Sequence, residues 1–283
     1  MPAKAGIHAE SEWTPAFAGV TNLSDAQTVA ALYRPMELDG WIVRRWGKDI
    51  PLRGYWSPLS LVSDVISLDR GVDTWMSLMP VEIESQQIGV DCASGHVAVL
   101  GLGLGWSAAL CALKQEVEEV TVVERDSSLI ALHEGLDLFG RLPGGAGAKV
   151  RIVEADAFDW RPDRAVDLLA PDIWLPLVGG DRVEEVRRMQ ANVAAERVYF
   201  WGQELEIARH GVAAGRLRLD DGEIADTVRE LGLPLAGLDS PDYAARLNAA
   251  AEQWMGDHWL SKLRPDWLVD PFLPISDAPA KQD

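Results

Sequence analysis

The nine residues VAVLGLGLG, numbered Val97 to Gly105, are the most informative stretch of this 283-residue chain. A short apolar run, typical of a buried strand, leads directly into glycine at every second position: Gly101, Gly103 and Gly105. Glycine has no Cβ and tolerates a positive φ, so a ligand can lie directly against the backbone at this point. The stretch therefore predicts a ligand site at the carboxyl end of a strand.

Strands and helices alternate from this stretch onward. Apolar runs predict strands over Val120 to Val123, Val150 to Val153, Val166 to Ala170 and Arg197 to Trp201. Helical patterns cover Ser107 to Lys114, Ser127 to Leu138 and Arg182 to Ala194. This alternation indicates parallel βαβ units with helices on both faces. The predicted fold class is α/β, a Rossmann-like doubly wound parallel sheet.

The flanking segments differ from this central pattern. Residues 1–21 show no consistent period, and we expect residues 1–35 to form an extension without stable structure. Residues 36–90 alternate short apolar groups with turn residues and end in a helical pattern, which predicts a small β-rich subdomain plus a helix. Residues 91–210 form the predicted sheet domain, and residues 211–283 are expected to form a helical part packed on it.

Charge, the length of apolar runs and the cysteine pattern argue against several classes of partner and location. Asp and Glu number 44 against 26 Lys and Arg, a formal net charge of −18, which disfavours nucleic acid. No apolar run is long enough to span a membrane, and the N-terminus lacks the apolar core of a signal peptide. The two cysteines, Cys92 and Cys111, are not arranged as CxxC. We therefore expect a cytoplasmic protein.

A metal site is not expected either. The five histidines are scattered along the chain and no ligand-spaced motif joins them: His8, His96, His133, His210 and His258.

Two acidic residues follow the next two predicted strands. Glu124 ends the second strand, where a carboxylate can accept hydrogen bonds from both hydroxyls of a ribose. Asp156 follows the third strand at the same sheet edge, where it suits the exocyclic amine of an adenine, and Phe158 can pack on the base. The glycine loop alone leaves the nucleotide open, because GLGWSA from Gly103 satisfies the looser GxGxxA form of a dinucleotide site.

The run from about Gly95 to Trp201 resembles a class I S-adenosylmethionine-dependent methyltransferase domain, and most closely its spermidine-synthase-like branch. VAVLGLGLG resembles the glycine loop of that branch, VTVVERD its ribose-binding segment and VEADAFDW its adenine-binding segment. The resemblance implies S-adenosylmethionine, or a decarboxylated relative, as ligand. The implied cofactor-binding residues are Gly101, Gly103, Gly105, Glu124, Asp156, Ala157 and Phe158.

The segment after the fourth strand departs from the polyamine-synthase pattern. It reads DLLAPDIWLP, in which Asp172 matches the position of that family's catalytic aspartate, but the second Asp of the motif is missing. Asp172 is our candidate catalytic residue, able to take a proton or to hold a cationic acceptor, and a structural capping role is the alternative. The missing Asp favours methyl transfer over aminopropyl transfer.

Aromatic residues follow three of the predicted strands. We expect an acceptor pocket suited to an amine or an aromatic nucleophile, with indole walls and polar residues closing it: Trp106, Trp174, Trp201, Gln203 and Glu204. An ammonium ion over an indole gains about 0.5–2 kcal/mol. The alternative is that these indoles pack beneath loops.

The leading hypothesis is therefore an S-adenosylmethionine-dependent methyltransferase acting on a small molecule or a protein, the former being favoured. The alternatives are a spermidine-synthase-like aminopropyltransferase, an NAD-dependent oxidoreductase, and a binding protein that keeps the fold without catalysis. The Trp-rich segment from Trp41 to Trp56 suits a homodimer contact.

Overall fold

The computed structural model describes residues 23–180, 182–216 and 218–260. Its central sheet has five parallel strands: β7 (Gly95–Leu100), β8 (Val117–Glu124), β9 (Val150–Glu154), β10 (Leu168–Pro171) and β11 (Arg197–Val198). Their spatial order is β9-β8-β7-β10-β11, so the chain starts in the middle and reverses direction once. This is the order 3-2-1-4-5 of a doubly wound sheet, and it confirms the predicted fold class.

The apolar strand β7 lies at the centre of this sheet because it can be buried on both faces. Val97, Ala98 and Leu100 have no exposed surface, and β7 pairs with β8 on one side and with β10 on the other. The helices associated with this sheet domain are α2 (Pro80–Cys92), α3 (Trp106–Leu113), α4 (Ser127–Leu136) and α5 (Arg182–Val193). Two short 3-10 segments, η1 (Phe139–Arg141) and η2 (Pro143–Lys149), lead into β9.

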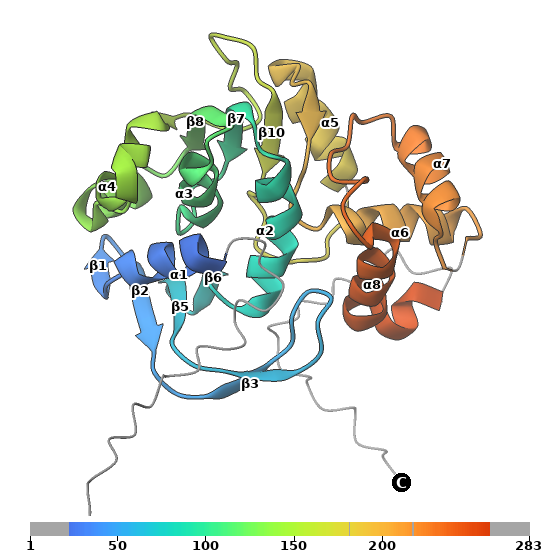
Figure 1. The fold of residues 1–283 in the computed structure, drawn as a ribbon, viewed down its shortest axis with the longest axis horizontal. Helices are drawn as coiled ribbons and strands as arrows, with labels where there is room; N and C mark the ends of the chain where they lie inside the picture. Colours follow the sequence, from blue (N-terminus) through green and yellow to red (C-terminus); the bar gives the residue numbers. More distant parts are fainter. Residues whose placement is uncertain (1–22, 181, 217, 261–283) are drawn as a thin grey trace, which may run out of the picture.

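A separate antiparallel sheet precedes the central one. It consists of β1 (Met36–Leu38), β2 (Trp41–Trp46), β5 (Val65–Arg70) and β6 (Asp73–Ser77), in the order β1-β2-β5-β6. Strands β3 (Ile50–Leu52) and β4 (Ser60–Val62) form a hairpin between β2 and β5. Helix α2 follows β6 and leads the chain into β7 (Figure 1).

The chain before β1 is not structureless throughout. Residues Leu23–Leu32 form helix α1, which buries Ala26, Val29 and Ala30. The Tyr33 hydroxyl is also buried and donates a hydrogen bond to the Leu104 carbonyl, at 2.9 Å, inside the glycine loop. The expectation of an unstructured extension is therefore wrong for residues 23–35, because this segment packs on the sheet domain. Residues 1–22 lie outside the described part of the chain.

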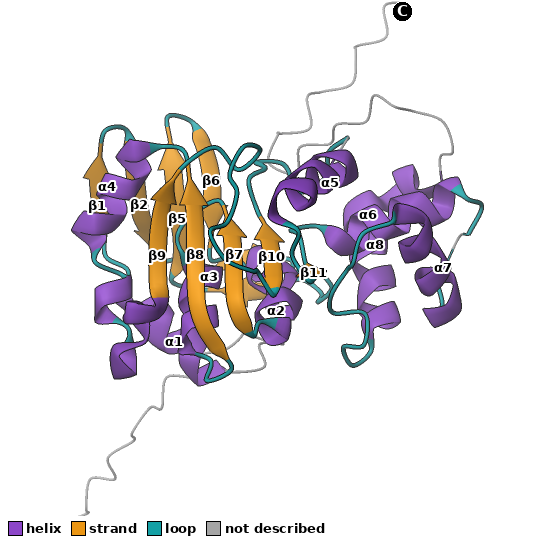
Figure 2. Cartoon of the chain, turned by 90° about the horizontal axis from the view of Figure 1, so that it is seen from above, coloured by secondary structure: helices purple, strands orange, loops and turns teal. Residues whose placement is uncertain are grey.

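Three helices follow the central sheet, in agreement with a helical C-terminal part. They are α6 (Gln203–Ala213), α7 (Asp221–Leu231) and α8 (Tyr243–Leu260), and they gather on the β10–β11 side of the sheet (Figure 2). A capping box between Asp220 and Glu223 starts α7. Within the residues described, only one parallel bridge, between Val198 and Leu235, extends the sheet beyond β11.

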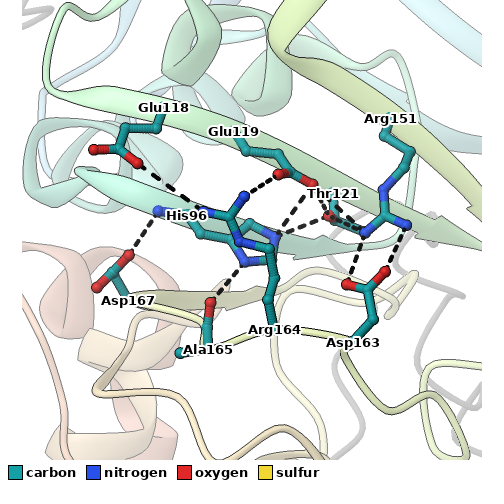
Figure 3. A network of polar contacts seen from close by, with 9 residues as sticks. All are labelled: His96, Glu118, Glu119, Thr121, Arg151, Asp163, Arg164, Ala165 and Asp167. Carbon is teal, nitrogen blue, oxygen red and sulfur yellow. Dashed lines mark hydrogen bonds and ion pairs between the residues drawn. The ribbon is translucent and has the colours of Figure 1, made fainter.

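No helix joins β9 to β10, and a polar network holds this connection instead (Figure 3). The buried His96 ring lies between the Ala165 carbonyl, 2.8 Å from Nδ1, and the Thr121 hydroxyl, 2.9 Å from Nε2. Glu119 of β8 accepts a hydrogen bond from Arg164 at 2.6 Å. These contacts fix the second half of the connection, around residues 164 and 165, to the amino ends of β7 and β8. The first half, from residue 155 onward, lies at the carboxyl ends of these strands.

Replacing His96 by alanine is expected to lower the free energy of unfolding by about 2–4 kcal/mol, because a buried ring and two hydrogen bonds are lost. Arg164→Ala removes only the ion pairs of a half-exposed side chain with Glu118 and Glu119, and it should cost about 1 kcal/mol or less. Urea denaturation of both variants measures the two values. Equal losses would show that the network does not depend on the buried ring.

Candidate active site

A cavity of about 290 Å³ lies at the carboxyl ends of β7, β8, β9 and β10. Strands β2, β5 and β6 and helix α2 supply further lining residues, so the cavity lies between the two sheets. The structure brings together here most of the residues predicted from sequence: Gly101, Gly103, Glu124, Asp156, Ala157, Phe158, Asp172, Trp174 and Trp201. The predicted ligand edge of the sheet is therefore hollow, which is the first requirement of a binding site.

The glycine loop can follow its path only because two of its residues lack a Cβ. A Cβ on Gly101 would lie 2.1 Å from the Asp172 carbonyl oxygen, and one on Gly103 would lie 2.5 Å from the Met76 sulfur. Both residues also have positive φ, +100° and +48°. The two glycines thus allow the loop to pack closely against β6 and the end of β10 while its backbone faces the cavity.

Gly105 has a different role from the one predicted. It precedes α3 with φ +73°, and a Cβ there would come within 3.0 Å of His133 and Phe139, so the residue serves packing and does not line the cavity. His133 supports the loop from this side, since its Nε2 lies 2.8 Å from the Gly103 carbonyl oxygen. Burial lowers the pKa of His133 to about 4, which keeps the ring neutral.

The Glu124 carboxylate organises the ends of β7 and β8. Its Oε2 accepts a hydrogen bond from the Leu102 amide at 3.0 Å, and its Oε1 accepts from the Arg125 and Asp126 amides at 2.8 Å each. A carboxylate has about four acceptor positions. One position on Oε2 therefore remains for a ligand hydroxyl. The sequence predicts that Glu124 accepts from both hydroxyls of a ribose, but the carboxylate has room for only one.

Asp156 lies at the same hollow, directly after β9. Its Oδ1 accepts from the Phe158 amide at 2.8 Å, which leaves Oδ2, 3.9 Å from Arg125, available to a donor. Arg188 of α5 stacks on the Phe158 ring at 4.8 Å. Asp156 and Phe158 thus present one acceptor atom and one aromatic ring to the end of the cavity that also holds Glu124.

Asp172 faces two residues of helix α2. The Gln86 side-chain nitrogen donates to Asp172 Oδ2 at 2.9 Å, and the other polar atom of that amide, Oε1, is buried without a partner. Glu82, one turn earlier on α2, also lines the cavity. Burial raises the pKa of Asp172 to about 7, opposed by the Arg182 charge, and burial raises the pKa of Glu82 to about 8.

Two of the predicted indoles form a wall next to Asp172. Trp174 lines the cavity with its ring nitrogen bonded to Glu185, and Trp201 lines it with its ring nitrogen bonded to Ser85 at 2.8 Å. A cation does lie over these rings, but it belongs to the protein: the Arg182 guanidinium is 4.6 Å from the Trp174 ring centre and 5.4 Å from that of Trp201.

Three residues predicted for this pocket do not line it. Trp106 is 1% exposed and packs in the core, as the alternative reading of the tryptophans had allowed. Gln203 and Glu204 are completely buried at the start of α6, where Gln203 bonds to Tyr243 and Glu204 lies among tyrosine hydroxyls including Tyr199. These predictions are corrected because α6 begins directly after Gly202 and directs both side chains into the interior.

The N-terminal subdomain contributes lining residues that the sequence analysis did not identify. Besides Glu82 and Gln86, they include Trp41, Arg70 and Trp75. Arg70 stacks on Trp41 at 4.7 Å, and both bond to Asp126, two residues after Glu124. The available signal was the spacing of Glu82 and Gln86, which puts one acid and one amide on the same face of α2.

Three buried carboxyl groups make stability depend on pH. Burial raises the pKa of Glu82 to about 8 and that of Asp172 and Glu204 to about 7, whereas all three lie near 4 in an unfolded chain. Between these limits unfolding releases protons, so the free energy of unfolding should fall as the pH rises from about 4 to about 8. We expect calorimetry to give the highest Tm at mildly acidic pH.

A matched pair of variants tests whether a buried carboxyl group causes this pH dependence of Tm. Glu204→Gln should flatten the fall in Tm, whereas Glu118→Gln, at a side chain that is 77% exposed, should leave its slope unchanged. A Tm that stays constant or rises across this pH range would contradict the assignment.

Two further properties hold for the part of the chain that the structure covers. No helix there combines the length and apolar character needed to cross a membrane. Among the same residues, no group of three or more His, Cys, Asp or Glu side chains is arranged to hold a metal ion.

No family model and no curated protein matches the chain. Among solved structures, a DhpI-SAM-HEP complex is 28% identical over 38% of this chain and 46% of its own, with a TM-score of 0.28. A putative RNA methyltransferase from Pyrococcus horikoshii is 21% identical over 43% and 56%, with a TM-score of 0.32. The 23S rRNA methyltransferase ErmE is 17% identical over 49% and 52%, with a TM-score of 0.33. The chain thus spans about half the length of these structures.

Proposed function

We propose that the protein binds S-adenosylmethionine in this cavity and transfers its methyl group to a small-molecule acceptor. The observation that carries the proposal is the convergence of the glycine loop, Glu124 and Asp156 on one hollow at the ends of β7, β8 and β9. Each supplies what one part of an adenosine needs: backbone without side chains, an acceptor for a hydroxyl, and an acceptor for an amine.

The lining residues fit such a ligand. The free position on Glu124 Oε2 would receive a ribose hydroxyl, Asp156 Oδ2 would receive the adenine amine, and Ala157 and Phe158 would border the base. When bound, S-adenosylmethionine supplies a methyl group that its sulfonium already activates. The protein then has mainly to align the acceptor and to take up a proton.

The acceptor would be held at the other end of the cavity. The unpaired Gln86 Oε1 can accept one hydrogen of a nucleophile, and Asp172, oriented by the nitrogen of the same amide, can accept another. Because its pKa is about 7, Asp172 can act as a base near neutral pH. These two acceptor atoms suit an amine better than an alcohol, because an alcohol offers only one hydrogen.

A thermal-shift panel with S-adenosylmethionine, S-adenosylhomocysteine, decarboxylated S-adenosylmethionine and NAD tests the proposal. A ligand at about 100 times its dissociation constant should stabilise the protein by about 2.7 kcal/mol. We expect the first two to raise Tm. A response to the decarboxylated donor alone would favour aminopropyl transfer, a response to NAD alone would favour an oxidoreductase, and no response would contradict the proposal.

A turnover assay completes the test. Formation of S-adenosylhomocysteine is followed with n-butylamine, benzylamine and phenol as probe acceptors, and we expect the amines to be the better substrates. Binding of S-adenosylhomocysteine without turnover of any probe would support the cofactor assignment and limit the acceptor to other molecules.

A further inference from the structure

The indole wall of the acceptor end is built from two separate loops. Trp174 belongs to the loop after β10, and Trp201 to the turn between β11 and α6. The two rings can define one surface only if these loops keep a fixed spacing, and neither loop is part of a regular element at this point.

The Arg182 guanidinium lies between these loops. Its Nη1 donates to the Leu177 carbonyl at 2.7 Å and to the Trp201 carbonyl at 3.1 Å, and its Nη2 donates to the Pro176 carbonyl at 2.6 Å. The same group stacks against both indoles. A single side chain, only 1% exposed, therefore joins the backbones of both loops and the faces of both rings.

The fold makes room for this contact at Gly202. A Cβ on Gly202 would lie 2.5 Å from Arg182 Nη1 and 3.2 Å from the Leu177 carbonyl oxygen, and its φ is +80°. A residue with a side chain would therefore displace the guanidinium. Gly202, which ends the turn after β11, thus provides the space that Arg182, the first residue of α5, occupies.

We propose that Arg182 is a positioning residue that holds Trp174 and Trp201 as the wall of the acceptor site. The competing explanation is that Arg182 only stabilises the fold, with the two indoles packed independently of it. Burying an arginine is costly, and the Nε of Arg182 is buried without a partner, so a fold that merely needed filling here would do as well with an apolar residue. The role in acceptor binding rests on the proposed transferase function, whereas the contact with the indoles does not.

Arg182→Ala tests this contact through tryptophan fluorescence and its quenching by acrylamide, a neutral quencher. We expect more quenchable fluorescence in the variant than in the parent protein, because the two indoles lose their fixed positions. The increase should disappear when Arg182→Ala is combined with Trp174→Phe and Trp201→Phe. Millimolar ethylguanidinium, which can enter the space left by the side chain, should reverse it, and ethylammonium should not.

Arg188→Ala is the matched control, since Arg188 is on the same helix and stacks on Phe158 at the cofactor end. It should leave acrylamide quenching unchanged. Arg182→Lys keeps a cation, but all its donors are on one nitrogen and it has no planar group to stack on the indoles. It should show an intermediate increase, and it provides the measurement if the alanine variant does not fold.

Isothermal titration with S-adenosylhomocysteine distinguishes a failure of the positioning role from a failure of the proposed function. Its dissociation constant should change by no more than about twofold in Arg182→Ala, because Arg182 shares no partner with Glu124 or Asp156. Unchanged quenching in both Arg182 variants, or an increase that survives replacement of the two indoles, would overturn the positioning role. Failure of the parent protein to bind S-adenosylhomocysteine would overturn the proposed function and leave the quenching result intact.

Discussion

Asp172→Asn is expected to lower methyl transfer by about 10²–10⁴-fold, the usual contribution of a general base. The amide is nearly isosteric with the carboxyl group but cannot accept a proton from the nucleophile. Because Asp172 follows β10, on the other side of β7 from Glu124 and β8, affinity for S-adenosylhomocysteine should not change. Initial rates and isothermal titration on the same preparation measure both quantities.

If Asp172 acts as the general base, its pKa also determines how turnover depends on pH. Burial raises the pKa of Asp172 to about 7, so the fraction that is ionised and able to act as base falls as the pH is lowered through this value. The rate should therefore decline about tenfold per pH unit on the acidic side. A rate in the parent protein that is flat from pH 5 to pH 8, or full activity in Asp172→Asn, would assign Asp172 a structural role.

Glu124→Ala is expected to weaken S-adenosylhomocysteine binding by about 10²-fold, the equivalent of about 2.7 kcal/mol. The substitution would remove the proposed acceptor for a ribose hydroxyl, and it leaves three backbone amides, those of Leu102, Arg125 and Asp126, without their partner. The glycine loop should lose its fixed conformation as a result. Isothermal titration gives the affinity directly.

Glu154→Ala is the control for this prediction. Glu154 pairs with Glu124 in register on the neighbouring strand β9, but it is exposed and does not line the cavity. Its removal should leave the affinity within about twofold of the parent. An equal loss in both variants would indicate a general charge effect at the sheet edge.

Much of the fold could be predicted from sequence because its signals are local. The apolar run from Val97 to Leu100 requires burial on both faces, and it forms the central strand. Helix α1 departs from the prediction: Ala26, Val29 and Ala30 follow a helical spacing, but the helix directly follows residues whose sequence has no period. Strand β11 is shorter than expected, yet backbone hydrogen bonds from Tyr199 and Trp201 to β10 continue its direction.

The site was predictable only where position along a strand determines position in space. Glu124 is the last residue of its strand, and Asp156 and Asp172 follow theirs; parallel strands bring such residues to one edge. Gln203 and Glu204 also follow a strand, but the left-handed conformation of Gly202 turns the next helix away from the cavity, and the sequence does not reveal that turn.

The burial of helix α2 limits which sequence changes and domain exchanges this protein can accept. All eleven residues from Pro80 to Val90 are buried, including Glu82, Glu84, Gln86 and Gln87, so these turns of the helix have no exposed face that could vary freely. It carries Glu82 and Gln86 into a cavity whose other side belongs to the parallel sheet. The N-terminal subdomain and the sheet domain are therefore not interchangeable modules. A chimaera that joins this sheet domain to a foreign N-terminal subdomain would have to keep α2 intact.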